Sequence, residues 1–270
     1  MYDHNGLVVI RWGKIMIKQL YVDIETAPYE AYVWRTGKQF VSHDSLKWGH
    51  RDGNIICVCY KWGHEKKVHS IEWNQNGDKE LVEKLVPVLI EADEIIAQNG
   101  DRFDIPYINT RIVANKLEAA PIWKTVDTLV IARKRFRFPS NRLDALGHFL
   151  LGEGKIRTDF KMWVDIKEND CTKAMAKMVR YCKKDVVLLQ RVYEEIGAFH
   201  KPKTHVGVST GGEKWTCAHC GSQDVNKSKL RYTAAGTPQY QMQCNNCHKY
   251  YTISNKSFVE YIDWRNEKEK

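Results

Sequence analysis

Hydrophobic and polar residues alternate along the segment KQLYVDIETAP, residues 18–28. Successive side chains of a β-strand point to opposite faces, so Leu20, Val22 and Ile24 share one face. Asp23 and Glu25 share the other face, near the end of this strand. Two carboxylates a few ångströms apart repel each other unless a proton or a cation lies between them. Taken alone, the segment fits either a cation site or an edge strand whose exposed face is acidic.

The hydrophobic pattern continues as alternating strands and helices up to about residue 199. Strands are predicted at residues 54–63, 66–73 and 93–99, and helices at residues 78–92, 105–117, 140–152 and 171–199. Pro106 suits the first turn of the second helix, and Ser140 or Asn141 is expected to cap the third. Residues 123–134 predict a strand or a short helix. Interleaved strands and helices favour an α/β sheet with helices packed on its faces.

The pattern and the local composition divide the chain into four parts. Residues 1–15 are expected to be an N-terminal extension, and residues 16–199 an α/β domain. Residues 200–214 are rich in Pro, Gly, Ser, Thr and Lys, which is typical of a linker. Residues 215–270 are expected to form a second, smaller domain. A chain of 270 residues is long enough for both domains.

The composition is that of a globular protein, with 43% hydrophobic and 28% charged residues. No apolar run approaches the ~18–20 residues that cross a membrane, so no membrane partner is expected. The N-terminus, with an early Asp3 and a short apolar run from Leu7 to Ile10, makes a poor signal peptide. We therefore expect a cytoplasmic protein. The net charge of +9 favours a polyanionic partner such as nucleic acid.

Three further side chains bear on the acidic strand. Asp104 follows the strand at residues 93–99, at the start of a helix, where it suits either a site or a helix cap. Tyr181 and Asp185 are four residues apart in a helical segment and therefore lie on one face of that helix. Each of these features is common when it is taken alone.

Together, the segments VDIET, NGDRFD and YCKKDV resemble the three motifs of the DEDD superfamily of 3′–5′ exonucleases, in its tyrosine-bearing (DEDDy) branch. The likeness is to the proofreading exonuclease domain of family B DNA polymerases and to its stand-alone prokaryotic and phage relatives. It covers about residues 17–197, and KTVDTL and SNRLDALG also look like segments of the stand-alone relatives. The motif residues are Asp23 and Glu25, then Asn99, Phe103 and Asp104, and finally Tyr181 and Asp185.

The resemblance implies an RNase H-like (DnaQ-like) α/β fold with two catalytic Mg²⁺ or Mn²⁺ ions. Such ions prefer oxygen ligands, and a pair of them can activate water and stabilise the attacking and leaving oxygens. By resemblance, Asp23, Glu25 and Asp185 hold the ion that activates water, and Asp23 and Asp104 hold the second ion. Tyr181 is expected to orient the attacking water. These ions would explain why Asp23 and Glu25 share a face.

Contacts with the substrate are predicted beside these acids and in one basic segment. Thr26, Asn99 and Phe103 adjoin the acids, and Arg142 ends the segment ARKRFRFPSNR. This segment suits either a groove for single strands or a solvated loop that its two phenylalanines anchor to the core. Trp34, Trp48 and Trp62 are expected in the core rather than on bases. The segment LGEGKIRT lacks the P-loop pattern, so no nucleotide cofactor is expected.

The eight cysteines fall into two groups. The first four are expected to be reduced structural residues: Cys57, Cys59, Cys171 and Cys182. The others form two C-x-x-C pairs separated by 23 residues: Cys217 and Cys220, then Cys244 and Cys247. This spacing predicts four thiolate ligands of one structural zinc ion, as in a zinc ribbon, although a ligand exchange with His219 or His248 stays open. Lysine, arginine and tyrosine residues around these pairs suit either a nucleic-acid surface or docking to a replication or recombination protein.

The sequence therefore predicts a metal-dependent exonuclease that removes nucleotides from the 3′ end of single-stranded DNA. Replication, repair or recombination in a prokaryotic cell or a phage-infected host is the expected setting. The same chemistry on RNA is an alternative, because discrimination by the 2′-hydroxyl depends on details of the pocket. A catalytically silent nucleic-acid-binding adaptor and an endonuclease of the same broad fold are further alternatives. The complete set of acids weighs against the adaptor, and the tyrosine-bearing third motif weighs against the endonuclease.

Overall fold

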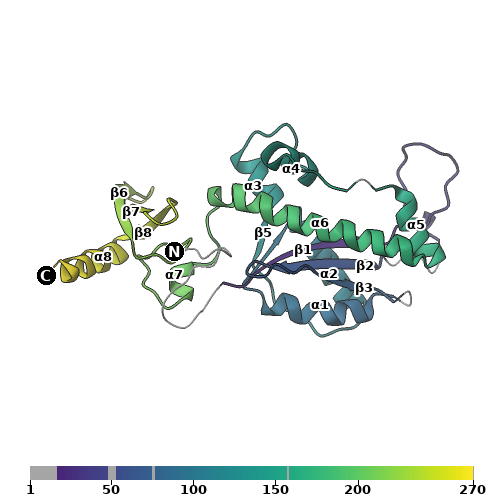
Figure 1. Ribbon diagram of the computed structural model, residues 1–270, viewed down its shortest axis with the longest axis horizontal. Coiled ribbons are helices and arrows are strands. Elements are labelled where there is room, and N and C mark those ends of the chain that lie inside the picture. Colours follow the sequence, from purple (N-terminus) through teal and green to yellow (C-terminus); the bar gives the residue numbers. More distant parts are fainter. Residues whose placement is uncertain (1–16, 48–52, 75–76, 157, 270) are drawn as a thin grey trace. The chain divides into compact units, whose positions relative to one another are not determined.

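The computed structural model describes residues 17–47, 53–74, 77–156 and 158–269. The expected extension at residues 1–15 and Trp48 lie outside the described residues. The chain forms two compact units, one of them Gln19–Gly197 and the other containing residues 198–269 (Figure 1). Each unit has its own hydrophobic core.

A five-stranded mixed sheet with the order β3-β2-β1-β4-β5 forms the centre of the first unit. Its strands are β1 (Gln19–Thr26), β2 (Ile55–Trp62), β3 (His69–Glu72), β4 (Glu94–Ala97) and β5 (Thr125–Asp127). β1 runs antiparallel to β2 and parallel to β4, and β4 runs parallel to β5. The strand that carries Asp23 and Glu25 is thus the middle strand of the sheet and not an edge strand.

Helices cover both faces of this sheet (Figure 1). They are α1 (Lys79–Glu91), α2 (Asp104–Ala114), α3 (Thr128–Arg135), α4 (Leu143–Leu151), α5 (Phe160–Asn169) and α6 (Thr172–Ile196). Leu20, Val22 and Ile24 pack against α1 and α2 on one face. Tyr21, which shares the other face with the two acids, packs in the core that includes α6. The alternation read from the sequence therefore directs Asp23 and Glu25 toward α6.

The predicted α/β arrangement is confirmed, with three local differences. Residues 123–134 form both a strand and a helix, which meet at Asp127, where the carboxylate accepts a hydrogen bond from Leu129 N at 2.9 Å. The expected cap at Ser140 or Asn141 is wrong, because α4 begins at Leu143 and Arg142 occupies the N-cap position. The helix α5 was not predicted, since only Met162 and Ile166 are buried along it and its apolar stripe is short.

Of the three tryptophans that we expected in the core, Trp62 is buried there and Trp34 is fully exposed. The prediction for Trp34 is wrong because this residue lies in a long loop between β1 and β2 rather than in a packed element. Within the described residues, none of the helices has both the length and the apolar character needed to cross a membrane.

The second unit contains a three-stranded antiparallel sheet and two helices. These elements are α7 (Val206–Ser209), β6 (Val225–Tyr232), β7 (Pro238–Cys244), β8 (Tyr250–Ser254) and α8 (Asn255–Lys268). The core is aromatic: Tyr240 stacks on Phe258 with ring centroids 3.6 Å apart, and Trp215 lies 5.5 Å from Tyr261. Within residues 200–214, expected to be a linker, α7 folds against this unit through a hydrogen bond from Val206 N to Ala218 O.

Candidate active site

Three carboxylates converge where β1 meets α6. Asp23 and Glu25 lie two residues apart on β1, and Asp185 projects from α6. One oxygen from each of the three lies within 4.8 Å of the other two. The strand period and the position of α6 bring together acids that are about 160 residues apart in the sequence.

Asp104 reaches the same strand from the start of α2. Its side chain is 3% exposed, and its Oδ1 accepts a hydrogen bond from Ile24 N at 3.2 Å. No side-chain capping bond forms at the N-terminus of α2, where Phe103 is the N-cap residue. The helix-cap interpretation of Asp104 is therefore wrong. Its carboxylate is instead bonded to the backbone of Ile24, the residue between Asp23 and Glu25 in β1.

Burial and mutual repulsion disfavour the ionised form of these carboxylates when no cation is bound. Burial raises the pKa of Asp23 well above its ordinary value, and Glu25, Asp104 and Asp185 raise it further. Burial followed by the charge of Asp185 raises the pKa of Glu25 to about 8, and burial raises that of Asp104 to about 7. A cation between these groups would relieve both effects.

The oxygen atoms present suit hard divalent ions. Oδ1 of Asp185 is buried and has no hydrogen-bond partner among the described residues, which leaves it available as a ligand. Carboxylate oxygens are the ligands that Mg²⁺ prefers, and Mg²⁺ retains positions for water and phosphate. The donor set of Asp23, Glu25 and Asp185 therefore fits such an ion.

Lys155 is the cation that the chain itself supplies. Its Nζ lies 2.5 Å from Oδ2 of Asp185 and 3.4 Å from the hydroxyl of Tyr181. Burial lowers the pKa of Lys155, but the charges of Asp185 and Asp23 outweigh burial, and its pKa is raised. Lys155 N donates to Oδ1 of Asp144 at 2.6 Å, which holds the backbone of Lys155 close to α4. Lys155 was not predicted as a site residue, and its partner Asp185 is 30 residues away in the sequence.

Tyr181 lies between Lys155 and an aromatic neighbour. The ring of Trp163 on α5 meets the ring of Tyr181 edge-on, with centroids 6.3 Å apart, and its side chain is close enough to Glu25 to contribute a small lowering of the pKa of that carboxyl. Burial and the charge of Asp185 raise the pKa of Tyr181 above its ordinary value. The phenol therefore stays neutral at physiological pH. Trp163 was not found from the sequence, since the helix that carries it was not predicted.

The predicted substrate contacts divide into two groups. Phe103 is 41% exposed and packs on Tyr107 with ring centroids 5.6 Å apart, and the buried Tyr107 hydroxyl has no hydrogen-bond partner among the described residues. Asn99 has a left-handed φ of 65°, and its N–H donates to Oδ1 of Asp127 at 3.0 Å. Thr26 is the last residue of β1, and Asn99 and Phe103 follow β4, so all three lie at the end of these strands where the acids lie. Arg142 is exposed just before α4, and no hydrogen bond or ion pair of the described residues joins it to the carboxylates.

The basic segment at residues 132–142 is anchored through its aromatic residues. Phe136 and Phe138 stack with centroids 4.9 Å apart, and both pack against the core of the first unit. The arginines and lysines between residues 133 and 137 are exposed. The anchoring phenylalanines fit the second alternative, although residues 132–135 belong to α3 rather than to a loop, and the groove for single strands stays a prediction.

Comparison with known proteins gives the first unit a family. The profile of the RNase H superfamily matches residues 20–197. This chain belongs to the RNase H superfamily. Among solved structures, its RNase H fold is similar to the family B DNA polymerase of the hyperthermophilic archaeon Pyrobaculum calidifontis, with a TM-score of 0.52 and 13% identity. The match covers 81% of this chain and 31% of the polymerase, and a search of curated sequences finds no significant match.

Three thiols lie directly beside the acids of this RNase H domain. Cys57 and Cys59 on β2 are the neighbours of Glu25 and Asp23, and their sulfurs lie 3.9 Å apart. The Sγ of Cys182 on α6 lies 3.5 Å from Oδ2 of Asp23. All three are buried free cysteines, as expected, and they fill the space between β2 and α6.

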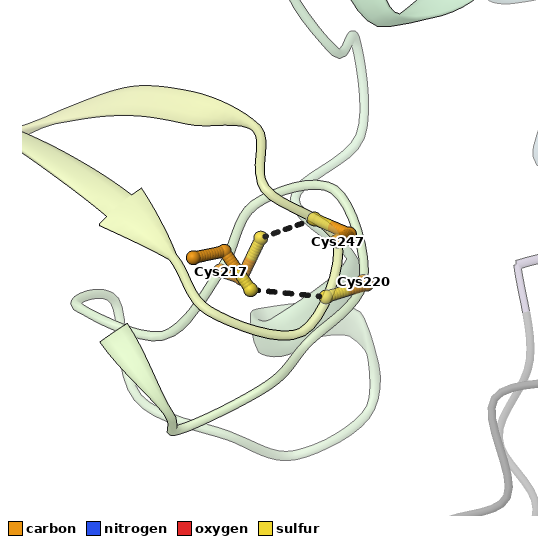
Figure 2. Close-up of side chains that lie close together, drawn as sticks. Cys217, Cys220 and Cys247 are labelled. Atoms are coloured by element: carbon orange, nitrogen blue, oxygen red, sulfur yellow. Dashed lines mark hydrogen bonds between the residues drawn. The ribbon is translucent and has the colours of Figure 1, made fainter. Parts of the chain in front are cut away.

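Beyond the RNase H match, the second unit gathers the four cysteines of the two C-x-x-C pairs. Sγ of Cys217 lies 3.7 Å from that of Cys247, and Sγ of Cys220 lies 3.6 Å from that of Cys244. Figure 2 shows the thiols of Cys217, Cys220 and Cys247 pointing toward one another. Tetrahedral zinc with bonds of ~2.3 Å places thiolate sulfurs about 3.8 Å apart, so this set fits zinc.

Two similar turns hold these thiols. Cys217 N donates to Ser222 O at 2.9 Å, and Cys244 N donates to Lys249 O, also five residues further on, at 3.0 Å. The residue after each C-x-x-C pair has a left-handed backbone, with φ of 74° at Gly221 and 59° at His248. His248 is exposed, and the group of possible ligands contains only the four cysteines. The cluster is compatible with a zinc ribbon.

Proposed function

We propose that this protein is a metal-dependent 3′–5′ exonuclease of the tyrosine-bearing branch, acting on single-stranded DNA in replication, repair or recombination. The observation that carries the proposal is the convergence of Asp23, Glu25 and Asp185 within 4.8 Å, with Asp104 bonded to the same strand. The raised pKa values of these acids support a site that is completed by cations.

The carboxylates divide the work of binding the ions. Asp23, Glu25 and Asp185 hold one ion, and Asp23 and Asp104 hold the second. Two Mg²⁺ or Mn²⁺ ions supply the Lewis acidity that phosphodiester hydrolysis needs. The role of the chain is to fix the oxygen ligands on a rigid strand and a long helix, which keeps their spacing constant during the reaction.

Tyr181 and Lys155 act on the water and on the charge around it. The phenol of Tyr181 is neutral because its pKa is raised, so it orients the attacking water by hydrogen bonding rather than by accepting its proton. Lys155, at 3.4 Å from this hydroxyl, offsets negative charge as the phosphate is attacked. Trp163 keeps Tyr181 and Glu25 in place.

Thr26, Asn99 and Phe103 position the terminal nucleotide. Phe103 and Tyr107 offer an aromatic surface beside the acids, and such surfaces stack on unpaired bases. Arg142 contributes a phosphate contact at longer range. An unpaired strand suits this arrangement, since a paired terminal base must first be separated from its partner before it can enter the site.

The second unit binds one structural zinc ion and contacts nucleic acid. Residues 226–232 of its edge strand β6 are all exposed and include Lys227, Lys229 and Arg231 without an acidic residue. A cationic strand of this kind favours a phosphate backbone over a protein partner of the replication or recombination machinery. This contact would add affinity that does not depend on the active site.

The direction of hydrolysis tests the proposed function. Three single-stranded DNA substrates carry the same sequence: a linear oligomer, the same oligomer with a phosphorothioate-blocked 3′ end, and a closed circle. With Mg²⁺, which binds sulfur poorly, the free linear strand should shorten while the blocked strand and the circle persist. Cleavage of the circle would indicate an endonuclease instead. An RNA oligomer of the same sequence, degraded faster than DNA, would indicate an exoribonuclease.

A further inference from the structure

A long loop between β1 and β2 forms an ordered projection beside the active site. Its base is a short antiparallel stem in which Tyr32 N donates to Ser45 O at 2.8 Å and Lys47 N donates to Glu30 O at 2.9 Å. At its tip, Nε2 of Gln39 donates to Arg35 O at 2.6 Å across a turn at Gly37. Figure 1 shows this loop in purple, standing out from the sheet near α5.

The loop presents apolar side chains that no packing explains. Trp34 is 104% exposed, Phe40 91% and Tyr32 72%. Val33 and Val41 beside them are also exposed. Large apolar side chains gathered on one exposed segment mark an interaction surface more often than a packing defect. We call residues 32–41 the aromatic loop.

The same helix holds the aromatic loop and the candidate active site. Nζ of Lys167 on α5 lies 2.9 Å from a carboxylate oxygen of Glu30 and donates to Pro28 O at 2.9 Å. Four residues earlier on α5, Trp163 contacts Tyr181 and Glu25. The loop also leaves β1 directly after Thr26. The stem is therefore fixed within one helical turn of the contacts that shape the site.

The charge of the aromatic loop indicates the chemistry of its ligand. Residues 31–43 contain Arg35 and Lys38 and no carboxylate. Glu30, at the base, is paired with Lys47 and Lys167. Exposed aromatic rings interleaved with cations suit a single-stranded nucleic acid, whose bases stack on the rings and whose phosphates meet the cations. An apolar protein partner would offer no negative charge to pair with Arg35 and Lys38.

We propose that the aromatic loop stacks on unpaired bases of the substrate strand, a few nucleotides to the 5′ side of the bond that is cleaved, and so extends the binding site beyond the terminal nucleotide. This inference rests on the proposed function for the position of the 3′ end. Binding of bases by the aromatic loop does not itself require the protein to be catalytically active. Trp34 and Phe40 are the stacking residues.

Binding and hydrolysis of strands of different length test this inference. The variants are Trp34→Ala/Phe40→Ala, Trp34→Phe, and Ile122→Ala as the matched control, because Ile122 is another fully exposed apolar residue. Binding of a fluorescein-labelled 20-nucleotide single-stranded DNA is measured by anisotropy without divalent ions. Stacking contributes ~1–3 kcal/mol per base, so the double variant should bind about tenfold or more weakly, Trp34→Phe should retain most of the affinity, and the control should be unchanged.

Hydrolysis with Mn²⁺ gives the second readout. In the double variant, the ratio of kcat/KM for the 20-nucleotide strand to that for a dinucleotide should fall about tenfold, because a dinucleotide is too short to reach the loop. Unchanged binding and an unchanged ratio would overturn the inference while leaving the exonuclease intact. Loss of binding in a protein that hydrolyses nothing would leave the loop contact standing and remove the proposed function. A change of oligomeric state in light scattering, with DNA binding unaffected, would assign the loop to a second copy of the chain.

Discussion

At the scale of single residues, the site is governed by acids that the fold takes out of water. Glu25, with a pKa of about 8, and Asp104, with a pKa of about 7, both ionise at a higher pH in the folded chain than in the unfolded chain. The folded state therefore binds more protons than the unfolded state between the ordinary carboxyl pKa and these raised values. Stability contributed by the protonated acids is lost as the pH rises through that range.

This linkage predicts how the stability of the first unit changes with pH and how Mg²⁺ alters that dependence. Without divalent salt, the temperature at the midpoint of thermal unfolding of the first unit should decrease as the pH is raised from 5 to 8, because Glu25 ionises with a pKa of about 8. Mg²⁺ should raise that midpoint more at pH 8 than at pH 5, since ionised acids bind it. Differential scanning fluorimetry measures both. In Asp23→Asn the magnesium effect should largely disappear, and an undiminished effect there would contradict the assignment of Asp23 as a ligand.

Lys155 provides a second prediction at this scale. Lys155→Met removes the positive charge 2.5 Å from Asp185 and should lower kcat by roughly 10²-fold while DNA binding changes little, because one fixed charge contributes on that order to electrostatic stabilisation. Lys161→Met, on the exposed surface of α5, is the control and should keep full activity. Steady-state kinetics with Mn²⁺ decide the matter. Equal kcat in both variants would show that Lys155 is only structural.

At the scale of elements, the site depends on close packing of α4 and α6. Gly147 of α4 leaves no room for a side chain: a β-carbon there would lie 2.8 Å from Cδ1 of Leu188 and 2.7 Å from the carbonyl oxygen of Glu153. Glu153 lies two residues before Lys155, so this contact also bears on the position of the segment that carries Lys155. The packing of two helices therefore reaches the charge balance of the site.

Gly147→Ala should consequently destabilise the first unit by about 1–3 kcal/mol, as overpacking does in tight cores. His148→Ala changes an exposed side chain on the same helix, so its free energy of unfolding should lie within about 0.5 kcal/mol of the wild-type value. Urea unfolding followed by circular dichroism gives both values. Wild-type stability of Gly147→Ala would mean that α4 can move away from α6 at no cost.

The elements also show what the sequence allowed us to predict. β1 and α6 could be predicted with their acids, because strand and helix periods place Asp23 with Glu25 and Tyr181 with Asp185 from local spacing alone. Lys155 and Trp163 could not, since each acts through a partner in a distant segment. Trp34 was assigned to the core on its residue type, whereas burial depends on whether a packed element surrounds the side chain.

At the scale of the whole molecule, the chain combines an RNase H domain with a small unit whose core is largely aromatic. The buried core of that unit consists of few residues, including the cysteines themselves. Zinc bound by four thiolates contributes on the order of 10 kcal/mol to the folding of such small domains. The two units are thus expected to unfold independently.

Cys220→Ser tests this division. The variant should lose its zinc, which a metal-release assay counts, and should expose Trp215, seen as a red shift in tryptophan fluorescence. Hydrolysis of short oligomers should stay within about threefold of the wild type, whereas binding to long strands should weaken and depend less on salt. Unchanged affinity at every salt concentration would favour protein docking as the role of this unit. If the four cysteines held no zinc, the tryptophan fluorescence of Cys220→Ser would be the same as that of the wild type.

The central claim is that Asp23 and its neighbouring acids hydrolyse a strand from its 3′ end with the help of divalent ions. The most direct measurement follows a 5′-labelled single-stranded DNA oligomer with wild type and Asp23→Ala, with Mn²⁺ and with the ion chelated. A ladder that shortens from the 3′ end, requires Mn²⁺ and is lost in the variant is the result that we predict. A ladder of equal intensity in Asp23→Ala, or no ladder in a wild-type protein that binds the strand, would contradict the claim.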